Sequence, residues 1–265
     1  MGDKAILVTG ASSGIGKTIA QMLKDVGYQV YAASRKVVTG NVVDGITHVQ
    51  MDVCNEPSVQ EAFKFIAAQN TPLYGIVNSA GLGLTGSVEF TSDTEARELF
   101  DTNVFGVLNV CRAAIPLLRE NKDGYIINIT SIAAQMGLPF RGIYSSSKFA
   151  VEGFTESLSL EVHQFGIKVC LIEPGDFRTN INTNRKKAKH NDQEAYNDLH
   201  ERILTQINHE VSTAPTPEAI GKKVIAILRS SHPRLRHRIA SPKALLSFWL
   251  MRVLPSRWFE AVLRK

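Results

Sequence analysis

The sequence contains few cysteines, and their arrangement argues against a disulfide framework or a thiolate metal site. Only three occur in 265 residues, Cys54, Cys111 and Cys170, an odd number without the spacing typical of metal ligands. All three lie in apolar stretches of sequence. We therefore expect buried, reduced thiols in a reducing compartment.

Long hydrophobic runs are also scarce. The first apolar run, residues 5–8, is far too short for a signal peptide, and the apolar stretch 244–254 is shorter than the roughly twenty residues of a bilayer crossing. We therefore predict a cytoplasmic protein. The histidines do not cluster with cysteines or carboxylates, so no metal site is expected, and His163, His190 and His200 are expected to be solvated.

Acidic residues are nearly absent from the last part of the chain. From residue 222 to residue 265 there are eleven Lys and Arg against the single acid Glu260, whereas the whole chain has a net charge of +5. Nucleic acid is one partner that such charge can indicate, but no aromatic-interleaved basic strand accompanies it, and we expect no nucleic-acid function. The hydrophobic content of 44% and charged content of 21% are ordinary for a soluble globular protein.

Short apolar runs alternate with helical patterns along the first 175 residues. Strands are expected at 4–9, 29–33, 47–51, 73–77, 125–130 and 168–172, and helices at 15–26, 56–69, 93–120 and 145–165. This alternation predicts a single α/β domain with a Rossmann-type, doubly wound parallel sheet and helices on both faces. The connection 34–47 is short and rich in Val and Gly, so we expect no full helix there.

Three glycines, Gly10, Gly14 and Gly16, lie between the first strand and the first helix. Their G-x-x-x-G-x-G spacing differs from the G-x-G-x-x-G fingerprint, but the physical needs are alike. One glycine permits a sharp turn, another lets the backbone approach a pyrophosphate, and a third lets the helix pack on the strand. The helix N-terminus attracts phosphate. The turn also holds Ser12, Ser13 and Ile15, and a structural turn without a ligand is the alternative.

The end of the second strand distinguishes between two nicotinamide cofactors. An NAD site usually holds an Asp or Glu there, to accept hydrogen bonds from the ribose hydroxyls. This chain has Ser34, Arg35 and Lys36 instead. Arg35 and Ser34 suit the 2′-phosphate of NADP(H), because a guanidinium forms charge-assisted bonds with phosphate. A solvated Arg-Lys pair is the alternative, and we predict NADP(H).

Tyr144 and Lys148 are four residues apart in a helical pattern, so their side chains share one face, roughly 5–6 Å apart at Cβ. A nearby ammonium favours the phenolate and moves the tyrosine pKa of about 10 toward the working pH. Ser131 follows the 125–130 strand, where its hydroxyl would be presented at the carboxyl end. The pair alone is common by chance and usually lies on a surface helix.

The glycine turn, Asn78-Ser79-Ala80-Gly81, Asn103, Ser131 and the Tyr144–Lys148 pair occur in an order and spacing that resemble the short-chain dehydrogenase/reductase family. The resemblance covers roughly residues 4 to 180. It implies that Tyr144 is the general acid or base, and that Lys148 binds the nicotinamide ribose and lowers the tyrosine pKa. It further implies that Ser131 holds the substrate oxygen and that Asn103 supports a water in a proton relay.

The same resemblance assigns further cofactor contacts. Ser79 stands where the family has a second Asn, which weakens the match slightly. The residues implied are Asp52 and Val53 at the adenine, Asn78, Ala80 and Gly81 after the fourth strand, and Pro174, Gly175, Phe177 and Thr179 at the nicotinamide.

The resemblance implies an enzyme that interconverts a carbonyl and an alcohol. The hydroxysteroid, retinol and acyl-dihydroxyacetone-phosphate reductase branches look most similar, which implies a bulky hydrophobic substrate and lipid metabolism. Family members often form dimers or tetramers through the helices that carry Asn103 and Tyr144, so a homodimer or homotetramer is expected. A non-catalytic NADPH-sensing regulator on the same fold is the second hypothesis, but such proteins typically lose the tyrosine or the lysine.

Two segments lie outside the shared motifs. Residues 181–215 are polar, and we expect either a lid on the substrate side or a disordered loop, with no strand. Residues 222–265 form a basic extension with an apolar core segment. Its 244–254 stretch fits packing on the protein's own core, a cap over the active-site mouth, or peripheral contact with a membrane.

Overall fold

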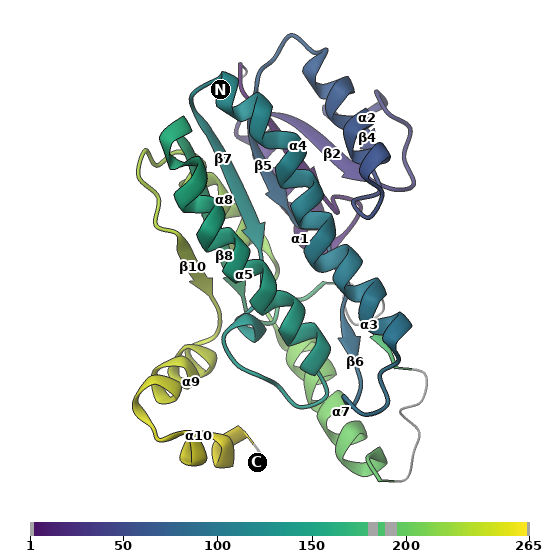
Figure 1. Ribbon diagram of the computed structural model, residues 1–265, viewed down its shortest axis with the longest axis vertical. Helices are drawn as coiled ribbons and strands as arrows, with labels where there is room; N and C mark the ends of the chain where they lie inside the picture. Colours follow the sequence, from purple (N-terminus) through teal and green to yellow (C-terminus); the bar gives the residue numbers. More distant parts are fainter. Residues whose placement is uncertain (1–2, 180–184, 189–194, 264–265) are drawn as a thin grey trace.

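The computed structural model describes residues 3–179, 185–188 and 195–263, and it is built around an eight-stranded sheet (Figure 1). The strand order is β10-β8-β7-β5-β1-β2-β4-β3, and all neighbours are parallel except β3 and β4. The strands are β1 (Ala5–Thr9), β2 (Gln29–Ser34), β3 (Val42–Val43), β4 (Ile46–Gln50), β5 (Leu73–Asn78), β7 (Gly124–Ile129), β8 (Ile167–Pro174) and β10 (Arg236–Ile239). The prediction of a single doubly wound α/β domain is confirmed.

Both faces of the sheet are buried, as the alternation of side chains along β1 illustrates. Ala5 and Leu7 point into one core, whereas Ile6 and Val8 point into the other. Helices α2 (Glu56–Ala67), α4 (Gly106–Glu120) and α5 (Gly142–Val162) supply the first core, and α1 (Gly14–Asp25) and α8 (Glu218–Leu228) supply the second. Burial on both faces explains why the central strands are continuous apolar runs.

The helix expected at 93–120 is interrupted. It consists of α3 (Asp93–Phe100), a π-helical turn η1 (Asp101–Phe105) and α4. In the wide turn the Gly106 N–H bonds to the Asp101 carbonyl, five residues back. A π turn inserts one extra residue into a helix and often marks a functional site. Here it carries Asn103, whose side chain is fully buried.

The connection between β2 and β4 contains no helix, as expected, but instead the short antiparallel strand β3. Residues 181–215 do contain a strand, β9 (Lys186–Lys187), which pairs with β6 (Leu84–Thr85) in a separate two-stranded sheet. The prediction of no strand there is therefore wrong. Residue pairing across about a hundred positions leaves no local sequence signal.

The remaining elements follow along the chain. They are η2 (Ile132–Ala134), η3 (His163–Phe165), α7 (Asn197–Thr213), α9 (Pro242–Val253) and α10 (Ser256–Leu263). In Figure 1 the helices α9 and α10 (yellow) lie beyond the carboxyl end of β10, apart from the helices that cover the sheet. Among the described residues, no helix has the length and apolar character needed to cross a membrane.

Two predictions about side-chain burial are wrong. Cys54 is exposed, with its Sγ 3.3 Å from Thr102 Oγ1, whereas Cys111 and Cys170 are buried. His200 is buried in α7, with its ring centroid 4.9 Å from that of Phe140. An apolar neighbour in sequence does not bury a loop residue, and a polar stretch can still form a helix with one packed face. His190 lies outside the described residues.

Candidate active site

Two adjoining cavities open where the central strands end. The larger, of about 470 Å³, extends from the glycine turn past the end of β2. The smaller, of about 70 Å³, lies between η2, the start of α5 and the loop after β8. Tyr144, Ile15, Gly83 and Thr179 line both cavities. A ligand in one cavity therefore meets a ligand in the other at Tyr144.

The glycine turn has the conformations that the sequence predicted. Gly10 and Gly14 have φ angles of +66° and +54°, which L side chains rarely adopt. A Cβ on Gly10 would lie 2.8 Å from the Ala80 backbone, and one on Gly16 would lie 2.5 Å from the Gly10 carbonyl oxygen. The Thr9 hydroxyl oxygen accepts hydrogen bonds from the backbone N–H groups that follow β5, which holds the two loops together. Only glycine fits this close packing.

The N-terminus of α1 suits a phosphate. Its N-cap residue, Ser13, makes no side-chain capping bond, and its first turn contains no acidic residue. The N–H groups at the start of a helix have no partner within the helix, and the helix dipole favours an anion there. The larger cavity is therefore shaped and charged to hold the pyrophosphate of a dinucleotide.

Most of the predicted cofactor residues line the larger cavity. They are Gly10, Ser12, Ser13, Gly14, Ile15, Gly16, Ser34, Arg35, Asp52, Val53, Ala80, Gly81, Tyr144, Lys148 and Thr179. Gly175 and Phe177 line the smaller cavity instead. Asn78 and Pro174 line neither, and Asn78 is buried, where its Nδ2 donates to Asn128 Oδ1 at 2.9 Å. The described residues contain no group of three or more His, Cys, Asp or Glu side chains that could hold a metal ion.

Ser131 and Tyr144 meet in the smaller cavity. Ser131 is the N-cap of η2, where its Oγ accepts a hydrogen bond from the Ala133 N–H at 3.1 Å. Its side chain also shares a hydrogen bond with Tyr144. Ser131 has an extended backbone at the point where the chain leaves β7, and both Ser131 and Tyr144 line the smaller cavity. The two hydroxyls predicted to hold one substrate oxygen are thus adjacent.

Lys148 and Asn103 lie on the cofactor side of Tyr144. Lys148 is buried. Its Nζ donates a hydrogen bond to the Ile129 carbonyl at 3.2 Å and lies 6.0 Å from the Tyr144 ring centroid. Asn103 Oδ1 accepts from the Leu82 N–H at 2.7 Å, and its Nδ2 donates to the Leu82 carbonyl and to Ser147 Oγ. Asn103 therefore fixes the loop after β5 against the helix that carries both Tyr144 and Lys148.

Burial governs the two titratable groups of this site. It raises the pKa of Tyr144, and the Ser131 hydrogen bond and the Arg141 and Arg185 guanidiniums oppose that rise. Burial lowers the pKa of Lys148 to about 8. The guanidiniums of Arg141 and Arg185, which the sequence analysis did not single out, thus lower the Tyr144 pKa.

The smaller cavity is lined by three charged side chains that the sequence analysis missed. Arg141 is the N-cap of α5, Asp176 follows the Pro174-Gly175 pair, and Arg185 precedes β9. The Arg141 Nε is buried without a hydrogen-bond partner among the described residues. Burial raises the pKa of Asp176, while both guanidiniums lower it. The sequence signal that could have found these residues is their proximity to the predicted motifs. Arg141, for example, is three residues from Tyr144.

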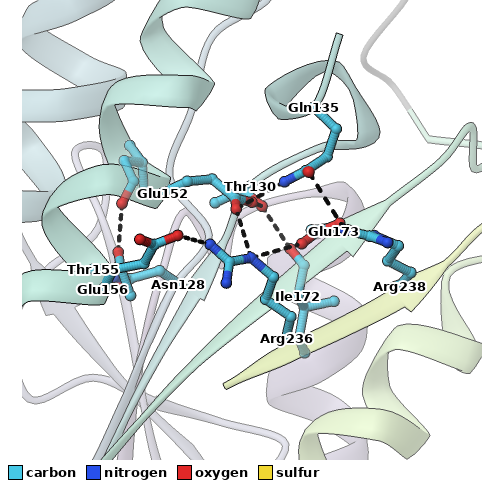
Figure 2. A network of polar contacts seen from close by, with 11 residues as sticks. Asn128, Thr130, Gln135, Glu152, Thr155, Glu156, Ile172, Glu173, Arg236 and Arg238 are labelled. Atoms are coloured by element: carbon cyan, nitrogen blue, oxygen red, sulfur yellow. Dashed lines mark hydrogen bonds and ion pairs between the residues drawn. The ribbon is translucent and has the colours of Figure 1, made fainter. Parts of the chain in front are cut away.

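A network of polar and charged side chains includes Thr130, Glu152 and Arg236 (Figure 2). Thr130, the residue before Ser131, donates from Oγ1 to Glu152 Oε1 at 3.0 Å. Arg236 Nε, from β10, donates to Glu152 Oε2 at 3.1 Å, and Gln135 Nε2 donates to the same oxygen at 3.0 Å. The network therefore ties the end of β7 and α5 to β10 at the edge of the sheet.

The second carboxylate of this network belongs to Glu173, whose side chain is 0% exposed. Arg238 Nε lies 2.5 Å from Glu173 Oε2, and Arg236 Nε lies 3.5 Å from Oε1. Glu173 immediately precedes Pro174-Gly175, and the Arg238 guanidinium lies 4.8 Å from the Phe248 ring of α9. Arg238 thus contacts both the end of β8, through its ion pair with Glu173, and helix α9, through the Phe248 ring.

Comparisons with known proteins agree on one family. Residues 4–190 match the family model described as short chain dehydrogenase. The chain is 38% identical to a 3-ketodihydrosphingosine reductase of Bacteroides thetaiotaomicron, covering 100% of this chain and 98% of the relative. It is 30% identical to retinol dehydrogenase 8 of Bos taurus, covering 89% and 81%. A solved short-chain dehydrogenase from Streptomyces avermitilis has a TM-score of 0.81 and 28% identity, covering 98% and 97%.

Proposed function

The chain belongs to the short-chain dehydrogenase/reductase family of oxidoreductases, which interconvert alcohols and carbonyls with a nicotinamide cofactor, and we propose that it reduces a bulky, lipid-like ketone with NADPH. The observation that carries this proposal is the position of Tyr144, at the junction of the two cavities and hydrogen-bonded to Ser131. A carbonyl in the smaller cavity would face both hydroxyls and the larger cavity at once.

Tyr144 donates the proton that the new alcohol needs, and Ser131 holds the carbonyl oxygen within hydrogen-bond distance of it. The cofactor supplies the hydride when it is bound. As negative charge develops on the substrate oxygen, the Ser131 hydroxyl and the nearby guanidiniums of Arg141 and Arg185 stabilise it. The same two guanidiniums oppose the rise that burial causes in the Tyr144 pKa, and so help to stabilise the phenolate that remains.

Lys148 holds the cofactor ribose from the wall of the larger cavity and adds positive charge on that side of Tyr144. Its pKa of about 8 leaves it mostly protonated at pH 7. Asn103 holds the loop after β5 in place and supports a water that returns protons to Lys148 from solvent. Both roles are proposals that the family resemblance supports.

The preference for NADPH is supported by the end of β2. Ser34 and Arg35 line the larger cavity where the adenine ribose would lie, and Arg35 is exposed and able to turn toward a phosphate. The only carboxylate among the predicted cofactor residues is Asp52, whose Oδ1 accepts from the Cys54 N–H at 3.0 Å. Asp52 is thus already engaged in holding its own loop.

The bulky substrate is supported by the surroundings of the smaller cavity. Its lining residue Ile132 also packs against the apolar cluster of Met136, Phe248 and Phe259. Phe248 and Phe259 belong to α9 and α10, so an alkyl chain that leaves the cavity past Ile132 would meet the C-terminal helices. This arrangement supports the cap, one of the three alternatives for the C-terminal segment, and the 3-ketodihydrosphingosine reductase is a relative of matching chemistry.

A homo-oligomer is part of the proposal. Phe105 of the π turn and Phe149 of α5 are 53% and 46% exposed on the helices where the family resemblance places subunit contacts. Aromatic side chains on a helical face are typical of such interfaces. Light scattering coupled to gel filtration would give the mass, and a monomer at micromolar concentration would remove this part of the proposal.

A panel of ketones tests the proposal. The purified protein is incubated with NADPH or NADH and with 3-ketodihydrosphingosine, a steroid ketone, retinal or a short water-soluble ketone, and absorbance of the reduced cofactor is followed. With NADPH, we expect faster turnover of the long-chain ketone than of the short ketone. For the long-chain ketone, we expect faster turnover with NADPH than with NADH. No turnover of any carbonyl with either cofactor would overturn the assignment.

A further inference from the structure

Helix α9 exposes a row of large apolar side chains to solvent. Leu245, Leu246, Trp249 and Val253 are 42%, 55%, 59% and 58% exposed. At about 100° per residue these positions fall within an arc of about 100° on one side of the helix. Trp258 of α10 adds a side chain that is 67% exposed. We call these five side chains the outer face.

The opposite side of the same helices accounts for their attachment to the protein. Phe248 and Phe259 are 4% and 8% exposed and pack with Met136, Ile132 and Leu138 next to the substrate cavity. An amphipathic surface helix normally places polar residues opposite its buried stripe. Helix α9 is apolar on both sides, so the outer face is not needed for folding onto the core.

The composition of the outer face indicates what covers it. Both tryptophans of the chain, Trp249 and Trp258, lie on it. Tryptophan and leucine side chains beside basic residues are typical of segments that lie in the interface of a bilayer. The sequence from 242 to 265 carries five Lys and Arg against the one acid Glu260, so the segment is electrostatically complementary to anionic lipid.

We propose that the outer face of α9 and α10 docks the protein on an anionic bilayer surface, with both helices lying in the plane of the interface. Helix α9 has 12 residues, whereas roughly twenty are needed to cross the hydrocarbon core. A second copy of this chain is a poorer occupant, because pairing two outer faces would bring together two segments with the same excess of positive charge.

The geometry gives this docking a purpose that rests on the proposed function. The outer face and the substrate cavity lie on two sides of one apolar layer, because Phe248 and Phe259 pack against Ile132, which lines the cavity. A lipid-like ketone can therefore pass from the bilayer to Ser131 and Tyr144 along α9. Docking would raise turnover of membrane-embedded ketones and leave that of water-soluble ketones unchanged.

Vesicle sedimentation tests the docking itself. The full chain is mixed with vesicles of phosphatidylcholine alone, or of phosphatidylcholine with about 30% phosphatidylglycerol. The buffer contains about 50 mM NaCl, so that charges are only weakly screened. We expect binding to the anionic vesicles, a blue shift of tryptophan emission on binding, and loss of binding as salt is raised. Both tryptophans lie on the outer face, so the emission reports this surface.

The double variant Leu246→Glu, Val253→Glu removes apolar area from exposed positions and should bind anionic vesicles about tenfold or more weakly. The matched control is Val38→Glu, Val42→Glu, which adds the same two charges at positions that are 74% and 60% exposed, far from α9 along the sheet order. The control should bind like the wild type. Circular dichroism should show both proteins folded.

The outcomes separate docking from the proposed function. Wild type that stays in the supernatant with anionic vesicles at low salt overturns the docking, even if it reduces soluble ketones normally. Equal vesicle binding by the double variant and the wild type also overturns the docking. The docking is likewise overturned if the wild type forms a dimer but binds no vesicles, and the double variant is a monomer. Vesicle binding without turnover of any ketone overturns the proposed function alone.

Discussion

The two cavities that meet at Tyr144 are built from different parts of the chain. The larger is lined mainly by glycines, small hydroxyl residues and backbone at consecutive strand ends. The smaller is lined by apolar side chains such as Ile132 and Phe177, and by Arg141, Asp176 and Arg185, charged side chains from three separate segments. The difference suggests that cofactor binding is set by backbone geometry, whereas the choice of substrate is set by side chains that need outside support.

The strongest perturbation of the substrate side is expected from Glu173→Gln. This change removes the charge that pairs with Arg238 at 2.5 Å and with Arg236 at 3.5 Å, and the Glu173 side chain is fully buried. Removing one partner of a buried ion pair typically costs about 3–5 kcal/mol, and the quarter-exposed Arg238 places this case near about 3 kcal/mol.

Urea unfolding followed by circular dichroism measures that loss, with the exposed substitution Glu201→Gln of α7 as the matched control. If the larger cavity does not depend on the Glu173 network, the NADPH affinity of folded Glu173→Gln should stay near that of wild type while the KM of the ketone rises. Equal unfolding midpoints for the variant and the control would show that the network does not support the substrate side.

Tyr144 belongs to both cavities, so Tyr144→Phe should affect catalysis without affecting either kind of binding. Loss of the transferable proton should lower kcat at least about a hundredfold, the scale of general acid–base catalysis. Tyr196→Phe is the control, because Tyr196 bonds to Glu89 away from Ser131. Steady-state kinetics and NADPH fluorescence titration check both parts, and normal turnover by Tyr144→Phe would contradict the assignment.

On the cofactor side, Arg35→Asp should change preference without changing the ketone's KM. The new carboxylate repels a 2′-phosphate and accepts bonds from ribose hydroxyls. Loss of a charge-assisted contact costs about 1.5–3 kcal/mol, so the ratio of kcat/KM for NADPH over NADH should fall by tens-fold. Lys36→Asp makes the same charge change one residue away, and an equal shift in that control would show a general field effect.

The smallest effect expected is a gain of stability in Lys148→Met. The unfolded chain keeps the lysine proton up to a pKa of 10.5, whereas the folded protein keeps it only up to about 8. Wild type is therefore penalised below pH 8, and its stability rises with pH between these values. The variant should be about 1–3 kcal/mol more stable than wild type at pH 7, though inactive.

The gain should shrink as the pH approaches 10.5, because neither state then binds the proton strongly. Thermal unfolding at several pH values measures it. A variant that is less stable than wild type at pH 7 would mean that the hydrogen bond from Lys148 to the Ile129 carbonyl outweighs the burial of the charge.

The difference between structure set by local sequence and structure set by distant side chains also explains what the sequence alone could predict. The glycine turn and the central strands depend on neighbours in sequence, so the close backbone packing at Gly10 and Gly16 and the parallel sheet were predicted correctly. The cofactor contacts of these glycines stay a prediction. The pairing of Arg236 with Glu152 joins residues 84 positions apart, and nothing local announces it. The π turn at Asn103 was also missed, because its helical pattern continues on both sides.

Transfer of deuterium tests the central claim, that Tyr144 and Ser131 present a carbonyl to a nicotinamide in the adjoining cavity. The protein is incubated with 3-ketodihydrosphingosine and with NADPH or NADH in which both hydrogens of the reactive nicotinamide carbon are replaced by deuterium, and the products are analysed by mass spectrometry. We expect one deuterium on the carbinol carbon, appearing faster from NADPH than from NADH and at least about a hundredfold slower with Tyr144→Phe. An alcohol without deuterium, or no alcohol from any ketone of the panel, would contradict the account.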